Sequence, residues 1–348
     1  MREAQLGSNH SVTAISLDSL ASFYRKMGRY NDAEPLFVQA LQISETQLGS
    51  NHPRSAEILS SLAEIYTLQG RYLEAQPLIE KSLSIAEQQL GAEHPNLVQI
   101  LCNLATNHRF QNNYFAAEAI YQRALEISEK IFEPTHTIVA LSLNNLAVIY
   151  LDQKRYNDAE ILYQRSLSIY ENALGKDHPY VAICLCNLIK LYYEQNRYKE
   201  AENLCLRAVE IDKTQLGEDH LHYANSISHL SRIYQYCGKL TEAEKLICKA
   251  LAIRQKKLNS NHVTVAISLQ RLATILAFQQ KYSEAEKHFI EAITILEPQQ
   301  EQQKHEFNEL QTEFCKFLQQ IIQKGLKQEL SKHSITQKYF QSILSGEV

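Results

Sequence analysis

Histidine is the residue type whose spacing in this chain most strongly suggests chemistry. Seven histidines recur at one interval of 42 residues: His10, His52, His94, His136, His178, His220 and His262. Imidazole nitrogens bind zinc at about 2 Å, whereas neighbouring packed helices lie about 8–10 Å apart. Consecutive histidines belong to successive repeats, so they cannot share one ion. We therefore predict that each histidine hydrogen-bonds the loop before a helix, and that the column binds no metal.

A glutamate column is the second candidate for chemistry, because carboxylates serve as general acids and bases. Its members are Glu34, Glu118, Glu160, Glu202, Glu244 and Glu286. Each lies in the first turn of a predicted helix, where the helix dipole favours a carboxylate, and a cation equivalent to Arg29 is close by. This setting indicates helix-end electrostatics. The sequence also contains no P-loop, GxGxxG, HExxH or GxSxG string. We therefore predict a protein that is not an enzyme and needs no cofactor.

Two apolar columns define the helices that carry these residues. One consists of Leu20, Leu62, Leu104, Leu146, Leu188, Leu230 and Leu272. The other consists of Ala33, Ala75, Ala117, Ala159, Ala201, Ala243 and Ala285. In the first repeat, apolar residues at helical spacing over 17–24 predict a first helix, which Gly28 ends. Asn31 or Asp32 is placed to cap a second helix, and Pro53 suits the start of the next first helix.

The repeated strings resemble a known family. Leu-x-x-Leu-Ala-x-x-Tyr, followed by Gly-x-Tyr-x-x-Ala-Glu, is similar to the tetratricopeptide repeat. The 42-residue period and the string from Leu143 to Ala147 resemble kinesin light chain-type repeats over roughly residues 6–297. The resemblance implies an all-α fold, a right-handed α-solenoid of seven antiparallel helix pairs over residues 11–297. It also implies a protein- or peptide-binding scaffold whose first helices line a concave groove.

Both ends of the array depart from the repeat. Residues 1–10 match the tail of a unit, and are either a stub that covers the first repeat or the remnant of a truncated gene. Residues 298–348 contain an apolar stripe from Phe307 to Ile322, which predicts a degenerate eighth repeat that caps the array. A coiled-coil seam is the alternative for this stripe. One more short helix is expected over residues 334–345.

Composition restricts the class of partner. The formal net charge of −4 lacks the basic footprint of a nucleic-acid-binding protein or a membrane-surface protein. No window approaches the roughly 18 consecutive apolar residues of a membrane span. The seven cysteines form no Cys-x-x-Cys pair and are expected to be reduced. The sequence therefore predicts a cytoplasmic protein with a protein partner, no nucleic acid and no membrane, and it leaves the oligomeric state open.

The residues opposite the apolar face of the first helices predict where a partner binds. We define the inner columns as positions 15, 19, 22 and 26 and their equivalents every 42 residues. The candidate peptide-binding residues on these columns are Asn103, Asn145, Asn187, Lys190, His229, Arg232, Tyr236, Arg271 and Phe278. Asparagine amides both donate and accept, so the asparagine ladder can pair with the backbone of an extended peptide. A solvated polar face is the alternative interpretation of the ladder.

The cations and rings from the fifth repeat onward predict that the peptide is acidic and aromatic. Glu194, in the same region, opposes this prediction. Two function classes stay open. The chain is either an adaptor that holds a peptide in its groove, or a regulatory or sensor segment of a larger signalling protein whose effector domain lies elsewhere.

Overall fold

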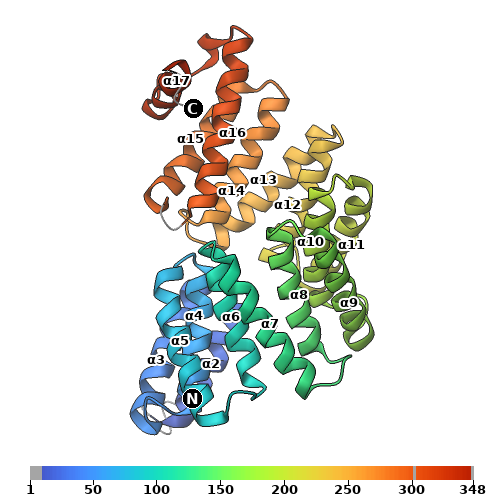
Figure 1. The fold of residues 1–348 in the computed structure, drawn as a ribbon. Coiled ribbons are helices and arrows are strands. Elements are labelled where there is room, and N and C mark those ends of the chain that lie inside the picture. Colours follow the sequence, from blue (N-terminus) through green and yellow to red (C-terminus); the bar gives the residue numbers. More distant parts are fainter. Residues whose placement is uncertain (1–9, 301–302, 346–348) are drawn as a thin grey trace. The chain divides into compact units, whose positions relative to one another are not determined.

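The computed structural model of the chain describes residues 10–300 and 303–345, and these residues are helical throughout (Figure 1). They form sixteen α-helices and two short 3-10 helices, and no strand occurs among them. The predicted remnant over residues 1–10 lies outside the described residues except for His10. The all-α prediction is confirmed.

The helices alternate between the two kinds that the sequence predicts. The first helices are α2 (Ser11–Lys26), α4 (Pro53–Leu68), α6 (Asn96–Phe110), α8 (Thr137–Asp152), α10 (Pro179–Glu194), α12 (Leu221–Tyr236) and α14 (Val263–Phe278). The second helices are α3 (Tyr30–Leu48), α5 (Tyr72–Leu90), α7 (Tyr114–Ile131), α9 (Tyr156–Leu174), α11 (Tyr198–Leu216), α13 (Leu240–Lys257) and α15 (Tyr282–Leu296). The remaining elements are η1 (Glu297–Gln299), α16 (Lys304–Gln323), η2 (Lys327–Glu329) and α17 (Ser334–Ser345).

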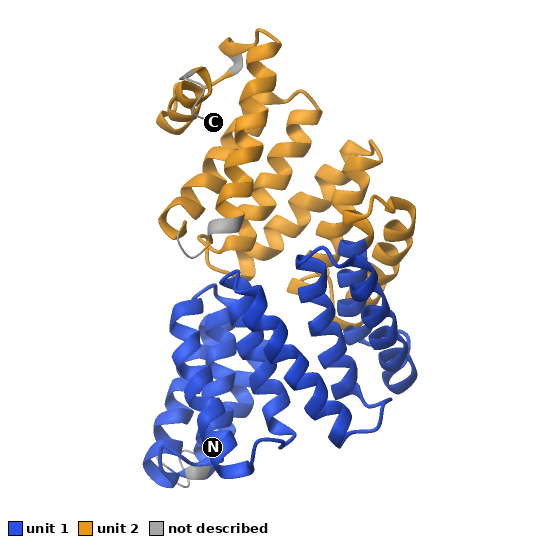
Figure 2. Ribbon diagram, viewed as in Figure 1, with its two compact units in different colours: residues 1–191 blue, residues 192–348 orange. Residues whose placement is uncertain are grey.

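The chain forms two compact units, unit 1 over residues 1–191 and unit 2 over residues 192–348, with the boundary inside α10 (Figure 2). Within unit 1, each helix from α2 to α9 packs on the next, and the first helices also contact one another in chain order. Unit 2 repeats this pattern from α11 to α16, with α12, α14 and α16 as its successive first helices. Each unit is therefore a stack of helix pairs, as expected for a solenoid.

The leucine and alanine columns form the core that the sequence predicts. Leu146 in unit 1 and Leu272 in unit 2 each expose 4% of their surface, and the alanine column is fully buried. Leu20 is the exception, with 42% exposed. Burying a leucine stabilises a fold by about 1.5–3 kcal/mol, so the repetition of this contact holds the pairs together.

The turn inside each helix pair uses a left-handed residue. Glycine takes this position as Gly28, Gly70 and Gly238, with φ between 71° and 80°. The other four pairs place a side chain there, with φ between 59° and 64°, at Asn112, Lys154, Asn196 and Gln280. A Cβ atom is unfavourable in this region, and asparagine tolerates it better than most residues. The repeat therefore keeps the turn geometry even where the glycine is lost.

The start of α3 differs from the sequence prediction. The left-handed turn at Gly28 brings the chain into the helix at Tyr30, after Arg29, which makes no side-chain cap. Asp32 lies inside the first turn, where its carboxylate accepts a 2.8 Å hydrogen bond from the Arg29 guanidinium. The prediction that Asn31 or Asp32 caps this helix was wrong, because the turn closes before either residue is reached.

The predicted C-terminal cap is confirmed. Phe314 and Phe317 of α16 are buried against Phe289 of α15, with ring centroids 5.4 and 5.3 Å away. The expected short helix is α17, and Tyr339 on it packs edge-on against Phe314. Among the described residues, no helix is long and apolar enough to span a membrane.

Candidate functional site

The histidine column caps the first helices. In all seven repeats the histidine Nδ1 accepts a hydrogen bond of 3.1–3.2 Å from the backbone N–H two residues later. This bond satisfies one of the free N–H groups at a helix start. The histidines have the architectural role that the sequence predicts, but each of these bonds is to the start of the helix and not to the loop before it. The described residues contain no group of three or more His, Cys, Asp or Glu side chains that could hold a metal ion.

The glutamate column joins successive repeats. Glu34 accepts a 2.8 Å ion pair from Arg71 of the next repeat, and Glu118 binds Arg155 of the next repeat at 3.0 Å. Glu202 and Glu244 pair with lysines of the following repeat in the same way. The sequence predicted electrostatics but placed the cation in the same repeat. The structure corrects this, because each helix start lies against the turn of the next pair.

Glu286 ends this column with a different partner. Its carboxylate accepts hydrogen bonds from the backbone N–H and the hydroxyl of Ser331 at 2.8 and 2.7 Å. The Thr336 hydroxyl donates a third bond of 2.5 Å. The segment that contains Ser331 and Thr336 thus takes the place that a cation of the next repeat has for the other glutamates of the column.

The asparagine ladder lies in unit 1 and bonds to neighbouring helices. Asn103 is buried, and its amide nitrogen donates to the Ser60 hydroxyl at 3.0 Å. The Asn187 amide donates to the Asn144 side-chain oxygen at 3.0 Å. Each amide therefore commits an N–H group to the preceding first helix. The sequence analysis expected these amides to pair with a peptide backbone. The bonds to neighbouring helices leave fewer of their N–H and carbonyl groups for a peptide.

Two cations of unit 1 share a counter-charge: Lys190 lies on an inner column, and Arg109 lies one position before the inner-column residue Phe110. Asp152 on α8 lies 2.5 Å from the Arg109 Nε and 3.2 Å from the Lys190 Nζ. Burial alone raises the pKa of the Asp152 carboxyl, but the two cations outweigh burial and the net shift is downward. Lys190, a predicted peptide-binding residue, is therefore already paired.

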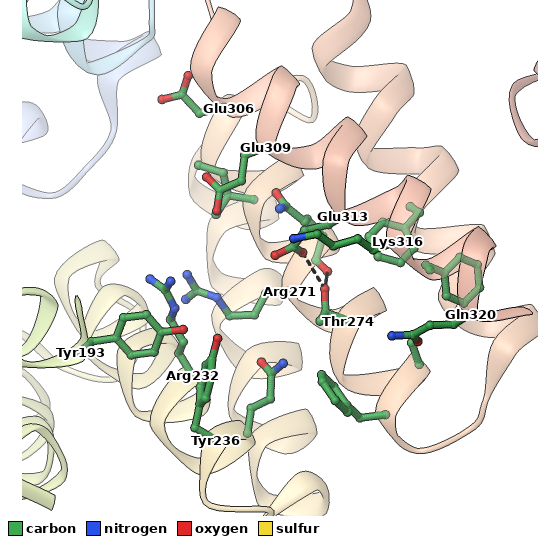
Figure 3. Close-up of a pocket in the computed structure, with 17 residues that line it drawn as sticks. Tyr193, Arg232, Tyr236, Arg271, Thr274, Glu306, Glu309, Glu313, Lys316 and Gln320 are labelled. Carbon is green, nitrogen blue, oxygen red and sulfur yellow. Dashed lines mark hydrogen bonds between the residues drawn. The ribbon is translucent and has the colours of Figure 1, made fainter. Parts of the chain in front are cut away.

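The inner columns of unit 2 surround a cavity of about 370 Å³. Four of the predicted residues line it, namely Arg232, Tyr236, Arg271 and Phe278. His229 is not among the lining residues. Tyr193, at the end of α10, belongs to the same wall (Figure 3). The volume falls in the usual range for small ligand sites, about 300–1,000 Å³.

Arg232 and Arg271 lie next to each other at this cavity (Figure 3). The Arg232 guanidinium lies over the Tyr193 ring, 3.5 Å from its centroid. Arg271 donates from Nη1 to the Ser228 hydroxyl at 2.6 Å, which ties α14 to α12. Burial, together with repulsion from the neighbouring cations Arg232 and Arg254, lowers the pKa of Arg271 to about 9. Within residues 10–300 and 303–345, neither Arg232 nor Arg271 forms an ion pair with a carboxylate.

The opposite wall of the pocket comes from α16, which the sequence analysis did not assign to the site. Glu309, Glu313, Lys316 and Gln320 fall on the four inner columns, seven periods beyond the first repeat, and all of them line the cavity. Extending the columns by one more period finds these residues. The sequence analysis did not include these four residues, because the apolar residues of α16 led to its interpretation as a capping helix alone.

The family model for the tetratricopeptide repeat matches most of the chain, in six overlapping segments. They are residues 12–75, 54–130, 99–172, 137–214, 187–255 and 223–297. The chain belongs to the tetratricopeptide repeat family. Repeats of this family generally serve as non-catalytic scaffolds for protein–protein interaction. No curated protein matches the sequence.

Solved structures share this fold at low sequence identity. A Rap protein complexed with competence and sporulation factor is 14% identical with a TM-score of 0.62, over 87% of this chain and 80% of that one. The apo form of RapI is 15% identical with a TM-score of 0.58, over 81% and 97%. A kinesin light chain-type protein of Podosopora anserina with nearly identical TPR-like repeats is 25% identical, with a TM-score of 0.46, over 59% and 97%.

Proposed function

We propose that this chain is a non-catalytic scaffold that binds a segment of a partner protein in the pocket of unit 2. Arg232 and Arg271 hold a carboxylate of that segment. The observation that carries the proposal is the pair of adjacent guanidinium groups at one cavity, without a bound carboxylate in the described chain. Unpaired cations that are partly buried cost free energy, and a ligand carboxylate relieves that cost. Arginine suits the role because its planar fork holds a carboxylate by two parallel hydrogen bonds.

Aromatic rings beside the arginines support an apolar anchor in the same segment. Tyr236 stacks on Tyr198 with centroids 5.1 Å apart, yet 54% of its surface stays exposed. Phe278, at the end of α14, is 62% exposed. Large exposed rings at a cavity lose contact with water when a ligand covers them, and such contacts dominate binding energy. An aromatic or aliphatic residue close to the carboxylate fits this surface.

We propose separately that Asn103, Asn145 and Asn187, on the inner columns of unit 1, contact the backbone of an extended peptide. An amide has two N–H groups and a carbonyl, so the bond from Asn187 to Asn144 leaves other groups of Asn187 for a ligand, whereas the Asn103 carbonyl already accepts a bond from Gln99. Asn103 is buried and contributes least. A Rap protein that shares this fold has been solved in complex with competence and sporulation factor, which is consistent with a ligand-binding role for the solenoid. The second candidate function, a regulatory segment of a larger protein, would use the same pocket.

The test is a screen of short capped peptides against the full chain, followed by affinity measurement with the double variant Arg232→Gln, Arg271→Gln. We expect a peptide with a carboxylate and an aromatic residue to bind, and the variant to lose roughly tenfold or more in affinity. Added salt should weaken binding to the wild type more steeply than binding to the variant.

A matched control removes two positive charges from exposed second-helix positions of unit 2, Lys256→Gln and Lys287→Gln. This variant should bind as the wild type does. The proposal fails if the screen yields only peptides whose affinity ignores Arg232 and Arg271, or if the control loses as much affinity as the double variant.

A further inference from the structure

The pocket of unit 2 has two walls of opposite charge. The wall from α12 and α14 carries Arg232 and Arg271. The wall from α16 carries Glu306, Glu309 and Glu313 (Figure 3). Lys316 also lies on α16 and offsets one of the three glutamates, so this wall stays acidic overall. The charges are separated across a cavity instead of being paired in contact.

The two walls do not neutralise each other. In the described part of the chain, Glu306 and Glu309 form no ion pair and no hydrogen bond. Glu313 accepts a 2.9 Å hydrogen bond from Thr274, which holds its carboxylate at the cavity edge. Glu309 favours the charged form of Arg271, but it does not offset burial and the two neighbouring arginines. Each wall therefore keeps most of its own field.

We propose that the pocket selects a partner segment with both a carboxylate and a cation, the carboxylate against Arg232 and Arg271 and the cation against Glu306 and Glu309. This inference rests on the proposed function and narrows the class of partner. A purely acidic segment gains at one wall and is repelled by the net acidic wall from α16, where three carboxylates outnumber Lys316. A segment of mixed charge gains at both, and specificity arises from the repulsive wall as much as from the attractive one.

The range of the field supports this selection. The Debye length is about 8 Å at physiological ionic strength, so solvent ions do not fully screen charges across a single small cavity. Charge complementarity of this kind orients a segment and excludes wrong partners. The acidic wall also belongs to α16, which caps the array, so one helix serves both the end of the fold and the ligand.

The test uses four capped pentapeptides with a central tyrosine that differ only in the flanking charges. They carry aspartate and lysine, lysine and aspartate, two aspartates, or two lysines. Affinities for the full chain are measured by calorimetry or by fluorescence polarisation. We expect one mixed-charge peptide to bind roughly threefold to tenfold more tightly than the peptide with two aspartates. The order of charges in the better binder reports the direction of the segment.

Two double variants of α16 change the net charge equally. Comparing them distinguishes the local effect of the pocket glutamates from the effect of the overall charge of the chain. Glu306→Gln with Glu309→Gln should weaken the mixed-charge peptide and strengthen the peptide with two aspartates. The control, Asn308→Lys with Thr312→Lys, adds the same two units of charge at exposed positions that do not line the pocket. It should leave the ranking of the peptides unchanged.

The inference is overturned if the peptide with two aspartates binds the wild type at least as tightly as either mixed-charge peptide. It is also overturned if both α16 variants shift the affinities equally. Binding that still depends on Arg232 and Arg271 in those cases leaves the proposed function standing. If no peptide binds in a way that Arg232→Gln and Arg271→Gln reduce, the proposed function and this inference fail together.

Discussion

The inner columns carry cations in both units, but the two units compensate them differently. In unit 1, the inner-column cation Lys190 lies 3.2 Å from the carboxylate of Asp152, which also pairs with Arg109 at 2.5 Å from outside the inner columns. In unit 2, Arg232 and Arg271 adjoin each other and a cavity, with no carboxylate bound to them in the described residues. Lys190 in unit 1 and Arg232 in unit 2 occupy the same column, so a cation on one column is paired in one unit and lacks a bound carboxylate in the other. What decides is whether a neighbouring repeat supplies the counter-charge.

The largest expected effects come from the core, where the two units should behave alike. Leu146→Ala in unit 1 and Leu272→Ala in unit 2 remove side chains of equal exposure, 4% each. Each should cost about 2–5 kcal/mol of unfolding free energy, since a buried cavity remains. Because each repeat contacts only its neighbours, amide exchange should accelerate mainly within the mutated unit.

Circular dichroism melting and hydrogen exchange check this prediction. Leu20→Ala is the matched control, because Leu20 occupies the same column with 42% of its surface exposed, and it should cost less than about 1 kcal/mol. An unchanged melting curve for Leu146→Ala, with no faster exchange around residues 140–180, would show that the leucine column is not the core.

Smaller changes in stability, which differ between the two units, are expected from substitutions of the inner-column charges. Asp152→Asn leaves Arg109 and Lys190 without their shared carboxylate and should cost about 2–3 kcal/mol, since the site is only partly buried. Arg271→Gln removes a buried cation that has no bound carboxylate but also its hydrogen bonds to Ser228; the two effects offset, so stability should change by less than about 1 kcal/mol. Urea unfolding of both variants measures the difference. Equal losses would contradict the comparison.

The pH dependence of the Asp152 contribution follows from its lowered pKa. In the folded state the pKa of the Asp152 carboxyl lies below its ordinary value of 3.8. As the pH falls, the carboxyl is therefore protonated in the unfolded state before it is protonated in the folded state. The stabilisation is therefore complete above about pH 5 and is lost as the pH falls through the lowered value. Asp152→Asn should remove this acid-dependent loss.

The sequence predicts most of the fold because the contacts of a repeat protein are local and periodic. The leucine column identifies the core, and helical geometry alone identifies the face that carries Arg232, Tyr236, Arg271 and Phe278. These four meet at one pocket, as side chains on neighbouring first helices at the same columns must. The role of the histidines also follows from their place just before each first helix.

What the sequence does not predict is which partner each polar side chain takes. Asn187 bonds Asn144, 43 residues away, and Lys190 bonds Asp152, 38 residues away. These pairings depend on the offset between adjacent helices and on side-chain rotamers, and the aligned repeat sequences specify neither. The α16 glutamates were missed for a different reason. The apolar residues of α16 do not match the repeat motif, although its inner-column residues keep the 42-residue register.

The smallest expected effect uses the turns to tune each unit separately. Lys154 in unit 1 and Gln280 in unit 2 hold the left-handed turn position, with φ of 61° and 64°, where Gly70 and Gly238 serve in other repeats. Replacing either by glycine relieves about 1 kcal/mol of strain but gives the unfolded chain more freedom, so the net stabilisation should be about 0.5 kcal/mol. Lys245→Gly, the same chemical change at an exposed position inside α13, should instead cost about 1 kcal/mol. Urea midpoints measured with hydrogen exchange should place the gain from Lys154→Gly in unit 1 and that from Gln280→Gly in unit 2. A gain from either variant that spreads evenly over both units would mean that the two units unfold as one.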